Sequence, residues 1–238
     1  MSELIAFLEP DQAVIGRRPA IIADLVSSGR RYPEDLPVLT SKETATLAEH
    51  YRFRLSRHTR RNGVRYTVDK MPLNMAHVAL IRQVFPGARF ILALRHPCDV
   101  VLSCFMQNFS LNDWMAAFST VEGAAALYRA TFAAWQSYVE AVETPAITVR
   151  YEDVVADLER EARRITAFLD LPFEPGMLAF HEHARGRGVL ATPRAAQVTQ
   201  PFDRTALGRW RRYGSVMDPI AERLSAEIER YGYAEKET

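Results

Sequence analysis

Three short stretches of this chain, at residues 65–69, 88–94 and 146–151, are rich in β-branched and aromatic side chains, and each leads directly into a helical pattern. Short apolar runs bounded by turn or helix signals are typical of buried β-strands. Strands that alternate with helices along a chain pair in parallel, and the helices cover the faces of the sheet. The order of these elements therefore predicts an α/β domain built on a parallel sheet.

Helical patterns are expected around these strands. They cover residues 73–84, 98–108, 121–142, 153–169 and 216–231. In the last two patterns apolar side chains recur every three or four positions, as on the buried face of an amphipathic helix. We predict a single domain over 1–238. Its parts, in chain order, are a mostly helical part (1–62), an α/β core (65–182), a basic loop or lid (183–214) and a C-terminal helix (215–238).

Composition limits the class of protein to which the chain can belong. Its 238 residues carry a net charge of +1 and are 48% hydrophobic, which suits a globular domain and excludes wholesale disorder. The apolar runs are shorter than the about 18 residues that span a bilayer, and no secretory leader is recognisable. Two cysteines are too few for a disulfide framework, so we expect a cytoplasmic protein. The near-neutral charge argues against nucleic acid as a partner.

Two of the predicted strands end in a cation, and a proline follows that suits the first turn of a helix. Lys70 and Pro72 follow the first strand, and Arg95 and Pro97 follow the second. Ligands of α/β proteins bind at the carboxyl ends of the strands, where helix N-termini add positive potential. The pattern favours an anion site. For Lys70 taken alone, a surface lysine paired with Asp69 is an equal alternative.

Further residues near the strand ends have weaker signals. Ser103 lies about two turns into the helix that starts near Pro97, where it can add a hydroxyl to the anion site, although spacing alone favours an ordinary helix residue. Tyr151 ends the third strand and faces either the same crevice or the core. The acids that follow, Glu152 and Asp153, suit the first turn of a helix.

A basic segment follows the core. Residues 183–217 hold seven arginines against the single acid Asp203, a net charge of +6. Such a segment suits a lid over a multiply charged anion, and the alternative is a solvated basic face that docks RNA. Aromatic side chains are few in it, which makes RNA the weaker interpretation. The nearby His181-Glu182-His183 lacks a further ligand cluster, so we expect no metal.

Several of these segments together are similar to the sulfotransferases that use 3′-phosphoadenosine 5′-phosphosulfate (PAPS), in their bacterial branch related to tyrosylprotein sulfotransferases. The segments that carry the likeness, over about 65–215, are Asp69-Lys70-Met71-Pro72-Leu73-Asn74, Phe85-Pro86-Gly87-Ala88-Arg89, Arg95-His96-Pro97-Cys98-Asp99-Val100-Val101-Leu102-Ser103, Arg150-Tyr151-Glu152-Asp153, Gln197-Val198-Thr199-Gln200-Pro201 and Gly208-Arg209-Trp210. The resemblance implies a parallel sheet flanked by helices, like that of P-loop NTPases. It also implies sulfuryl transfer from PAPS, without a metal, to a hydroxyl or amine of a small molecule, peptide or carbohydrate.

The resemblance also implies roles for individual residues. Arg95 and Ser103 match the pair that binds the 3′-phosphate of the nucleotide, and Tyr151 matches a tyrosine that lines its site. Lys70 matches the lysine that stabilises charge near the sulfuryl group, which makes it the catalytic candidate. Arg209 matches a basic residue that closes over the phosphates. These roles agree with the anion site expected from the strand ends.

The sequence departs from the family at its beginning. Relatives start with a strand and a loop of the Pro-Arg-Ser-Gly-Thr-Thr type, whose N–H groups surround the 5′-phosphosulfate, and no such loop precedes the first helix here. Without this first strand we expect unpaired sheet edges or a strand supplied by a partner. Where relatives carry a glutamate base, residue 17 is Arg17, which cannot accept a proton at neutral pH.

Two interpretations of these departures stay open. In one, the loop is encoded upstream of a wrongly assigned Met1. In the other, the protein has lost catalysis and keeps a nucleotide-binding or scaffold function. Arg17 favours the second interpretation or a different base, for which Glu9 and Asp11 are the nearest carboxylates. A kinase of P-loop architecture is disfavoured because the Gly-Lys-Ser/Thr loop is absent.

Overall fold

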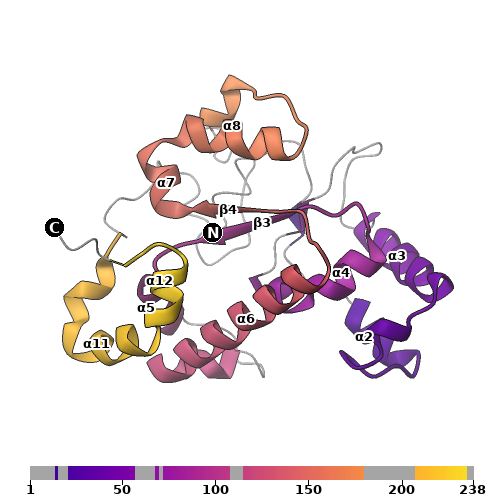
Figure 1. Cartoon of the computed structure of the whole chain (residues 1–238), viewed down its shortest axis with the longest axis horizontal. Helices are drawn as coiled ribbons and strands as arrows, with labels where there is room; N and C mark the ends of the chain where they lie inside the picture. Colours follow the sequence, from indigo (N-terminus) through magenta and orange to yellow (C-terminus); the bar gives the residue numbers. More distant parts are fainter. Residues whose placement is uncertain are drawn as a thin grey trace.

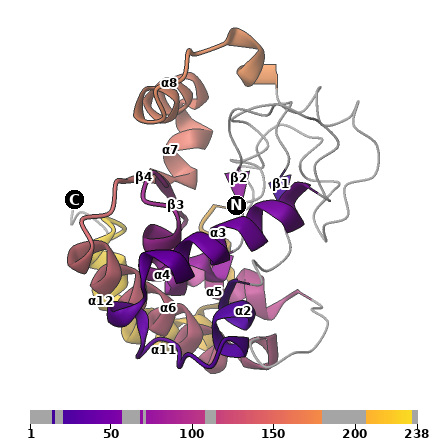
Figure 2. The ribbon, with the colours of Figure 1, turned by 90° about the vertical axis from the view of Figure 1, so that its right-hand side faces the viewer.

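A computed structural model describes residues 14–15, 21–56, 68–69, 72–107, 115–179 and 207–234. Two parallel strands, β3 (Phe90–Leu94) and β4 (Ala146–Arg150), lie at the centre of the fold (Figure 1). They pair over their whole length, and the last residues, Leu94 and Arg150, lie opposite each other. A second parallel pair joins β1 (Val14–Ile15) to β2 (Val68–Asp69) and is seen in Figure 2.

Successive side chains of a strand point to opposite faces of the sheet. Different helices cover the two faces of the β3–β4 pair. On one face Ile91 of β3 and Val149 of β4 pack in a cluster with the fully buried Ile165. This cluster is closed by α7 (Tyr151–Ala156) and α8 (Leu158–Phe168), which lie above the strands in Figure 1. The helices that directly follow β4 therefore cover this face.

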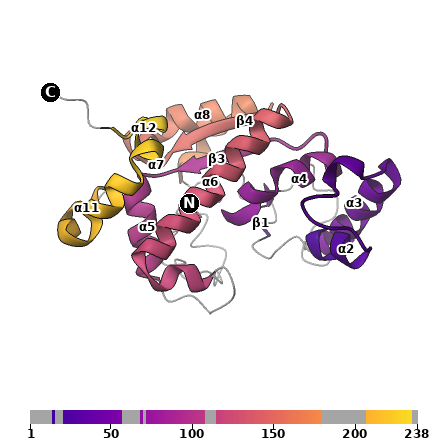
Figure 3. The ribbon, with the colours of Figure 1, turned by 60° about the horizontal axis from the view of Figure 1, so that its bottom comes forward.

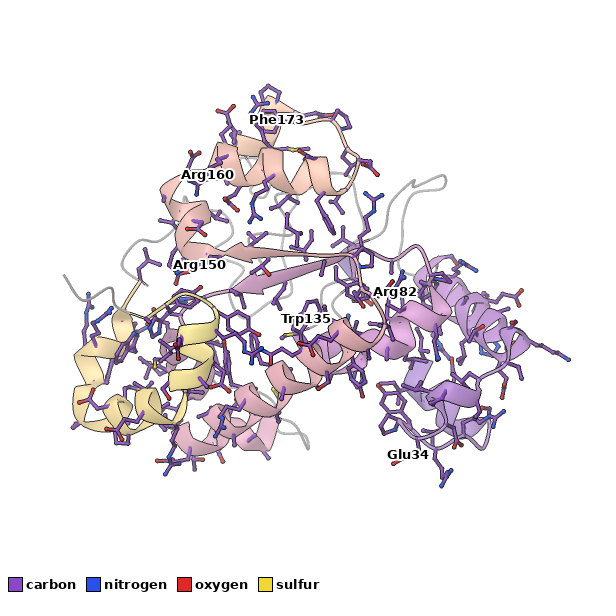
Figure 4. The ribbon with its side chains drawn as sticks, viewed as in Figure 1. Glu34, Arg82, Trp135, Arg150, Arg160 and Phe173 are labelled. Carbon is purple, nitrogen blue, oxygen red and sulfur yellow. The ribbon has the colours of Figure 1, made fainter. Side chains whose placement is uncertain are left out.

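The opposite face packs on the longest helix. Leu92 belongs to a second cluster, which includes residues of α5 (Pro97–Phe105) and α6 (Val121–Ala141). Trp135 of α6 lies below β3 in Figure 4, and its ring meets that of Phe90 edge-on with 6.2 Å between the centroids. Aromatic pairs prefer this geometry. Strand β3 and the start of α5 thus pack against the same helix, α6.

The C-terminal part of the chain packs on the same second cluster. The buried residues are Met217 and Ile220 of α11 (Gly214–Arg223) and Leu224, which lies between α11 and α12 (Ser225–Arg230); each is at most 1% exposed. Burying aliphatic side chains completely stabilises a fold by about 1.5–3 kcal/mol each. The C-terminal segment is therefore an integral part of the core and lies beside α5.

The N-terminal helices form a third cluster with their own apolar core. They are α2 (Ile21–Ser27), α3 (Ser41–Ser56) and α4 (Val78–Val84), and Figure 3 shows them grouped at the end of the molecule away from α11. Asp24 of α2 receives two hydrogen bonds from the guanidinium of Arg54, at 2.6 and 2.5 Å, so the first two helices are joined by a bidentate ion pair.

Short 3-10 segments connect these elements. In the part of the chain that the structure describes they are η1 (Leu36–Val38), η2 (Pro72–His77), η3 (Met115–Ser119), η4 (Pro175–Ala179) and η6 (Arg209–Tyr213). Across the same residues no helix has both the length and the apolar character needed to cross a membrane.

The predicted α/β class is confirmed, and the strands expected at 88–94 and 146–151 form β3 and β4. A continuous helix over 153–169 was wrong. The chain leaves helical geometry at Asp157, whose side chain accepts a hydrogen bond from the N–H of Arg160 and so starts a new helix, α8. The helix expected over 216–231 is likewise divided, at Leu224. The strand β1 lies in the part expected to be mostly helical.

Candidate functional site

The carboxyl ends of β3 and β4 bring two predicted site residues together. Arg95 follows Leu94 and Tyr151 follows Arg150, and these two preceding residues are paired across the strands. The guanidinium carbon of Arg95 lies 5.5 Å from the centre of the Tyr151 ring, which is a cation–π distance. The Arg95 side chain is 16% exposed. A positive group thus sits against an aromatic ring at the edge where α/β proteins bind ligands.

The turn between β3 and α5 is held by its own side chains. His96 precedes the helix and accepts a hydrogen bond at its Nδ1 from the N–H of Cys98, at 3.3 Å. Burial lowers the pKa of His96, so the imidazole is neutral and serves as an acceptor. Burial also raises the pKa of Cys98 to about 12, which keeps its thiol protonated and unsuited to nucleophilic attack. His96 thus caps the start of α5 through its Nδ1, and Cys98 is a buried, protonated thiol.

Asp99, in the first turn of α5, joins the strand end to the C-terminal segment. Its Oδ2 accepts a hydrogen bond from the N–H of Gly208 at 2.8 Å, and its Oδ1 accepts one from the N–H of Trp210 at 3.0 Å. The same Oδ2 lies 3.6 Å from Nη2 of Arg95. The N–H groups of Gly208 and Trp210, the residues on either side of Arg209, are therefore held next to Arg95.

A second carboxylate, Glu152 of α7, binds the neighbouring strand end. It accepts hydrogen bonds from the N–H of His96 at 3.0 Å and from the hydroxyl of Tyr233 at 2.8 Å. The Tyr233 ring also lies under the guanidinium of Arg150, whose carbon is 4.0 Å from the ring centre. Figure 4 shows Arg150 where β4 ends, close to the C-terminal helices. Polar contacts thus join the ends of β3 and β4 to Tyr233, which follows α12.

The remaining predicted residues are placed as follows. Ser103 is half-buried on α5, one helical turn beyond Asp99 and so on the same side of the helix. Arg209 is exposed at the start of η6. Lys70 lies outside the described residues. Its neighbour Asp69 accepts a hydrogen bond from the Tyr51 hydroxyl at 2.9 Å, and burial raises the pKa of this carboxyl.

Other predicted features also fall outside the described residues. They include Arg17, the segment His181-Glu182-His183 and most of the basic segment 183–217, of which residues 207–217 are described. Where side chains are described, no group of three or more His, Cys, Asp or Glu residues is placed to hold a metal ion.

Sequence reasoning gave Asp99 no role and assigned Glu152 only to the helix dipole. Both acids lie in the first turn of a helix that follows a strand, and that position is the one local signal that marks them. Their partners are 56 to 111 residues away along the chain, so local patterns cannot reveal these contacts.

Comparison with known proteins matches this chain to a family model and to curated relatives. The model of a family described as the sulfotransferase family matches residues 25–175. An uncharacterized protein of Aquifex aeolicus (strain VF5) is 25% identical over 218 residues, covering 85% of this chain and 27% of that protein. Protein-tyrosine sulfotransferase A of Caenorhabditis elegans is 25% identical over 177 residues, covering 69% of this chain and 44% of that protein. The chain thus spans less than half the length of these curated relatives.

A solved structure supports the fold. The sulfotransferase domain from the curacin biosynthetic pathway superposes with a TM-score of 0.50 at 17% identity, over 75% of this chain and 68% of that one. At this identity the likeness concerns the arrangement of helices and strands alone.

Proposed function

This chain belongs to the sulfotransferase family, and we propose that it transfers a sulfuryl group from PAPS to a hydroxyl or amine acceptor. The observation that supports the proposal is the meeting of Arg95, Tyr151 and the backbone around Arg209 at the carboxyl ends of β3 and β4. Guanidinium groups bind phosphate through paired N–H donors. A nucleotide that carries an additional phosphate on its ribose suits such a site.

The proposed roles follow the chemistry of each side chain. Arg95 and the Ser103 hydroxyl bind the 3′-phosphate, Tyr151 lines the nucleotide site and Arg209 closes over the phosphates. PAPS, when bound, supplies a sulfuryl group attached to a phosphate that leaves readily. Lys70 stabilises negative charge near that group, since a fixed cation favours the more highly charged transition state. The proposal needs no metal, because arginine and lysine provide the positive charge.

The acceptor is proposed by class. The curated relatives of Caenorhabditis elegans and Danio rerio are named protein-tyrosine sulfotransferases, so a tyrosine-containing peptide is the first acceptor to test, ahead of carbohydrates and small phenols. We place the reaction in the cytoplasm because two cysteines are too few for a disulfide framework. Protein, carbohydrate or small-molecule acceptors are the proposed partners, and nucleic acid and membrane are not among them.

The alternative function is nucleotide binding without transfer. It is favoured by Arg17, which stands where the family resemblance implies a glutamate base. Two measurements on the same preparation separate the possibilities. One is the equilibrium binding of adenosine 3′,5′-bisphosphate by calorimetry, and the other is transfer of labelled sulfate from PAPS to the acceptor panel. Binding with transfer supports the enzyme, binding without transfer supports the alternative, and absence of binding overturns both.

Variants of two lysines test the proposed role of Lys70 in sulfuryl transfer. We expect Lys70→Ala to abolish most transfer while bisphosphate affinity stays within about threefold of wild type, because the proposed contact forms with the sulfuryl group in the transition state. Lys42→Ala removes the same charge from the exposed face of α3 and should change neither quantity. Equal activity of the two variants would contradict the role of Lys70.

A further inference from the structure

Asp99 is a buried carboxylate that lies 3.6 Å from Nη2 of Arg95 and accepts its hydrogen bonds from residues far away in the sequence. Its side chain is 1% exposed, so water cannot compensate its charge. Its two oxygens accept hydrogen bonds from the backbone N–H groups of Gly208 and Trp210, which are 109 and 111 residues away. An ionised carboxylate accepts stronger hydrogen bonds from peptide N–H groups than a neutral oxygen does. Both oxygens of the Asp99 carboxylate thus hold the backbone of another segment in place.

That segment needs an external acceptor. The 3-10 helix η6 (Arg209–Tyr213) begins after Gly208, which has no side chain with which to cap the first N–H groups. Gly208 has φ 63°, a left-handed conformation, and a Cβ added there would lie 2.9 Å from Nη1 of Arg211. A capping side chain on residue 208 is therefore disfavoured. Asp99 supplies the missing cap from α5, because it accepts from Trp210 in the way that an N-cap residue accepts from the second helical position.

Arg209 lies between the two peptide units that Asp99 holds. We propose that Asp99 is a positioning residue of the anion site, which fixes the backbone around Arg209 beside Arg95 so that both cations meet the same phosphorylated ligand. This inference rests on the proposed function, since it takes Arg209 as a ligand contact. It deepens that function by naming the residue that determines where this cation stands.

The variant Asp99→Asn should weaken bisphosphate binding, whereas the change of charge alone would strengthen it. Asp99→Asn removes a negative charge near an anion site, and charge alone predicts tighter binding of an anion. The asparagine amide, however, has one acceptor oxygen and one NH₂ donor, and the donor would face a backbone N–H. One of the two hydrogen bonds is then lost and the segment loosens. We expect bisphosphate binding to weaken by about tenfold.

The matched control is Asp153→Asn. Asp153 occupies the first turn of α7, which follows the neighbouring strand β4, so the substitution changes the same charge at the same edge. Asp153 has no hydrogen bond or ion pair to the described part of the C-terminal segment, residues 207–234. Its variant should bind adenosine 3′,5′-bisphosphate within about twofold of wild type or slightly more tightly.

A double-mutant cycle tests whether Asp99 acts through Arg209. Arg209→Ala should weaken bisphosphate binding by about ten- to a hundredfold. In that background Asp99→Asn should change the affinity by less than about twofold, because the positioned cation is already gone. A purely structural role for Asp99 predicts that the two losses multiply, and that result overturns the inference.

Amide hydrogen exchange of the ligand-free protein gives an independent readout. Asp99→Asn should speed exchange at Gly208 and Trp210 by about tenfold or more, while core amides of α6 keep their protection. Unchanged exchange at these two amides overturns the inference, as does wild-type bisphosphate affinity of the Asp99 variant. If the wild-type protein does not bind the bisphosphate, the proposed function fails first and this inference fails with it. Normal wild-type binding with an unaffected Asp99 variant overturns the inference alone.

Discussion

One carboxylate oxygen of Glu152 accepts a hydrogen bond from the backbone N–H of His96 at 3.0 Å. His96 follows β3, and Glu152 lies in the first turn of α7, which follows β4, so the bond joins the two strand ends where the strand pairing stops. The other oxygen binds the Tyr233 hydroxyl at 2.8 Å. Glu152 thus joins the residue after Arg95 to the residue after Tyr151, and it also binds Tyr233. These contacts stabilise the relative positions of Arg95 and Tyr151.

Replacement of Glu152 should destabilise the protein. In Glu152→Ala the N–H of His96 and the hydroxyl of Tyr233 lose their acceptor, and both residues are buried. We expect the free energy of unfolding, measured in urea, to fall by about 2–3 kcal/mol. Glu159→Ala is the control, since its exposed ion pair with Arg163 within α8 contributes about 0.3–0.5 kcal/mol. Equal losses in the two variants would show that the Glu152 contacts do not stabilise the fold.

The first turn of α3 predicts a defined pH dependence. The hydrogen bond from Arg30, together with those from the side chain and backbone of Thr40, lowers the pKa of Glu43 from 4.5 to about 2. Because this carboxyl has a lower pKa in the folded protein, its stabilisation is complete above about pH 4.5 and is lost as the pH falls toward 2. Glu43→Gln should therefore flatten the dependence of unfolding free energy on pH in this window. An unchanged slope in Glu43→Gln would contradict this assignment.

Arg95 should contribute to the binding of one particular phosphate. We expect Arg95→Ala to weaken adenosine 3′,5′-bisphosphate binding by about 1.5–3 kcal/mol, the strength of a charge-assisted hydrogen bond. The affinity for adenosine 5′-monophosphate, which lacks the 3′-phosphate, should stay unchanged. Arg163→Ala removes the same charge from the exposed side of α8 and should affect neither ligand. Loss of affinity for both nucleotides, or for neither, would contradict the 3′-phosphate assignment.

A comparison of two glycine variants distinguishes the effect of backbone strain on stability from its effect on ligand binding. Gly208 and Gly29 both have positive φ angles, 63° and 88°, so an alanine at either position is strained. Each substitution should lower the unfolding free energy by about 1 kcal/mol. Gly208→Ala should also weaken bisphosphate binding by about fivefold or more, because the turn before Arg209 shifts. Gly29 lies in the N-terminal helical part, and Gly29→Ala should bind normally. Normal binding by both variants would argue that the geometry at 208 is irrelevant to the site.

Local patterns predicted much of the central fold. The apolar runs at 88–94 and 146–151 identified β3 and β4 because a buried strand has a recognisable composition, and the proline at 97 marked the start of α5. The break at Asp157 was missed because the apolar spacing continues across it, while the capping hydrogen bond interrupts the backbone. The two-residue strand β1 has no periodicity to detect.

The candidate site was predictable where it depends on strand ends and not where it depends on distant contacts. Parallel pairing places Arg95 beside Tyr151 once the strands are known. Asp99 could not be assigned, because its hydrogen-bond partners Gly208 and Trp210 are 109 and 111 residues away and are brought to it by the packing of the C-terminal part on the core. Packing of this kind is determined by the whole chain and not by any one segment.

The contact between α5 and η6 also has a temporal consequence during protein synthesis. A ribosome adds Asp99 of α5 long before it adds residues 208–210, which are 109 to 111 positions further on. At roughly 5–20 residues per second, this interval is on the order of 5–20 s. During that time the nascent chain exposes the surface that α11 and α12 later cover. A chain that stops short of residue 208 therefore carries Arg95 but lacks both the cap that Asp99 forms with η6 and the core contacts of α11.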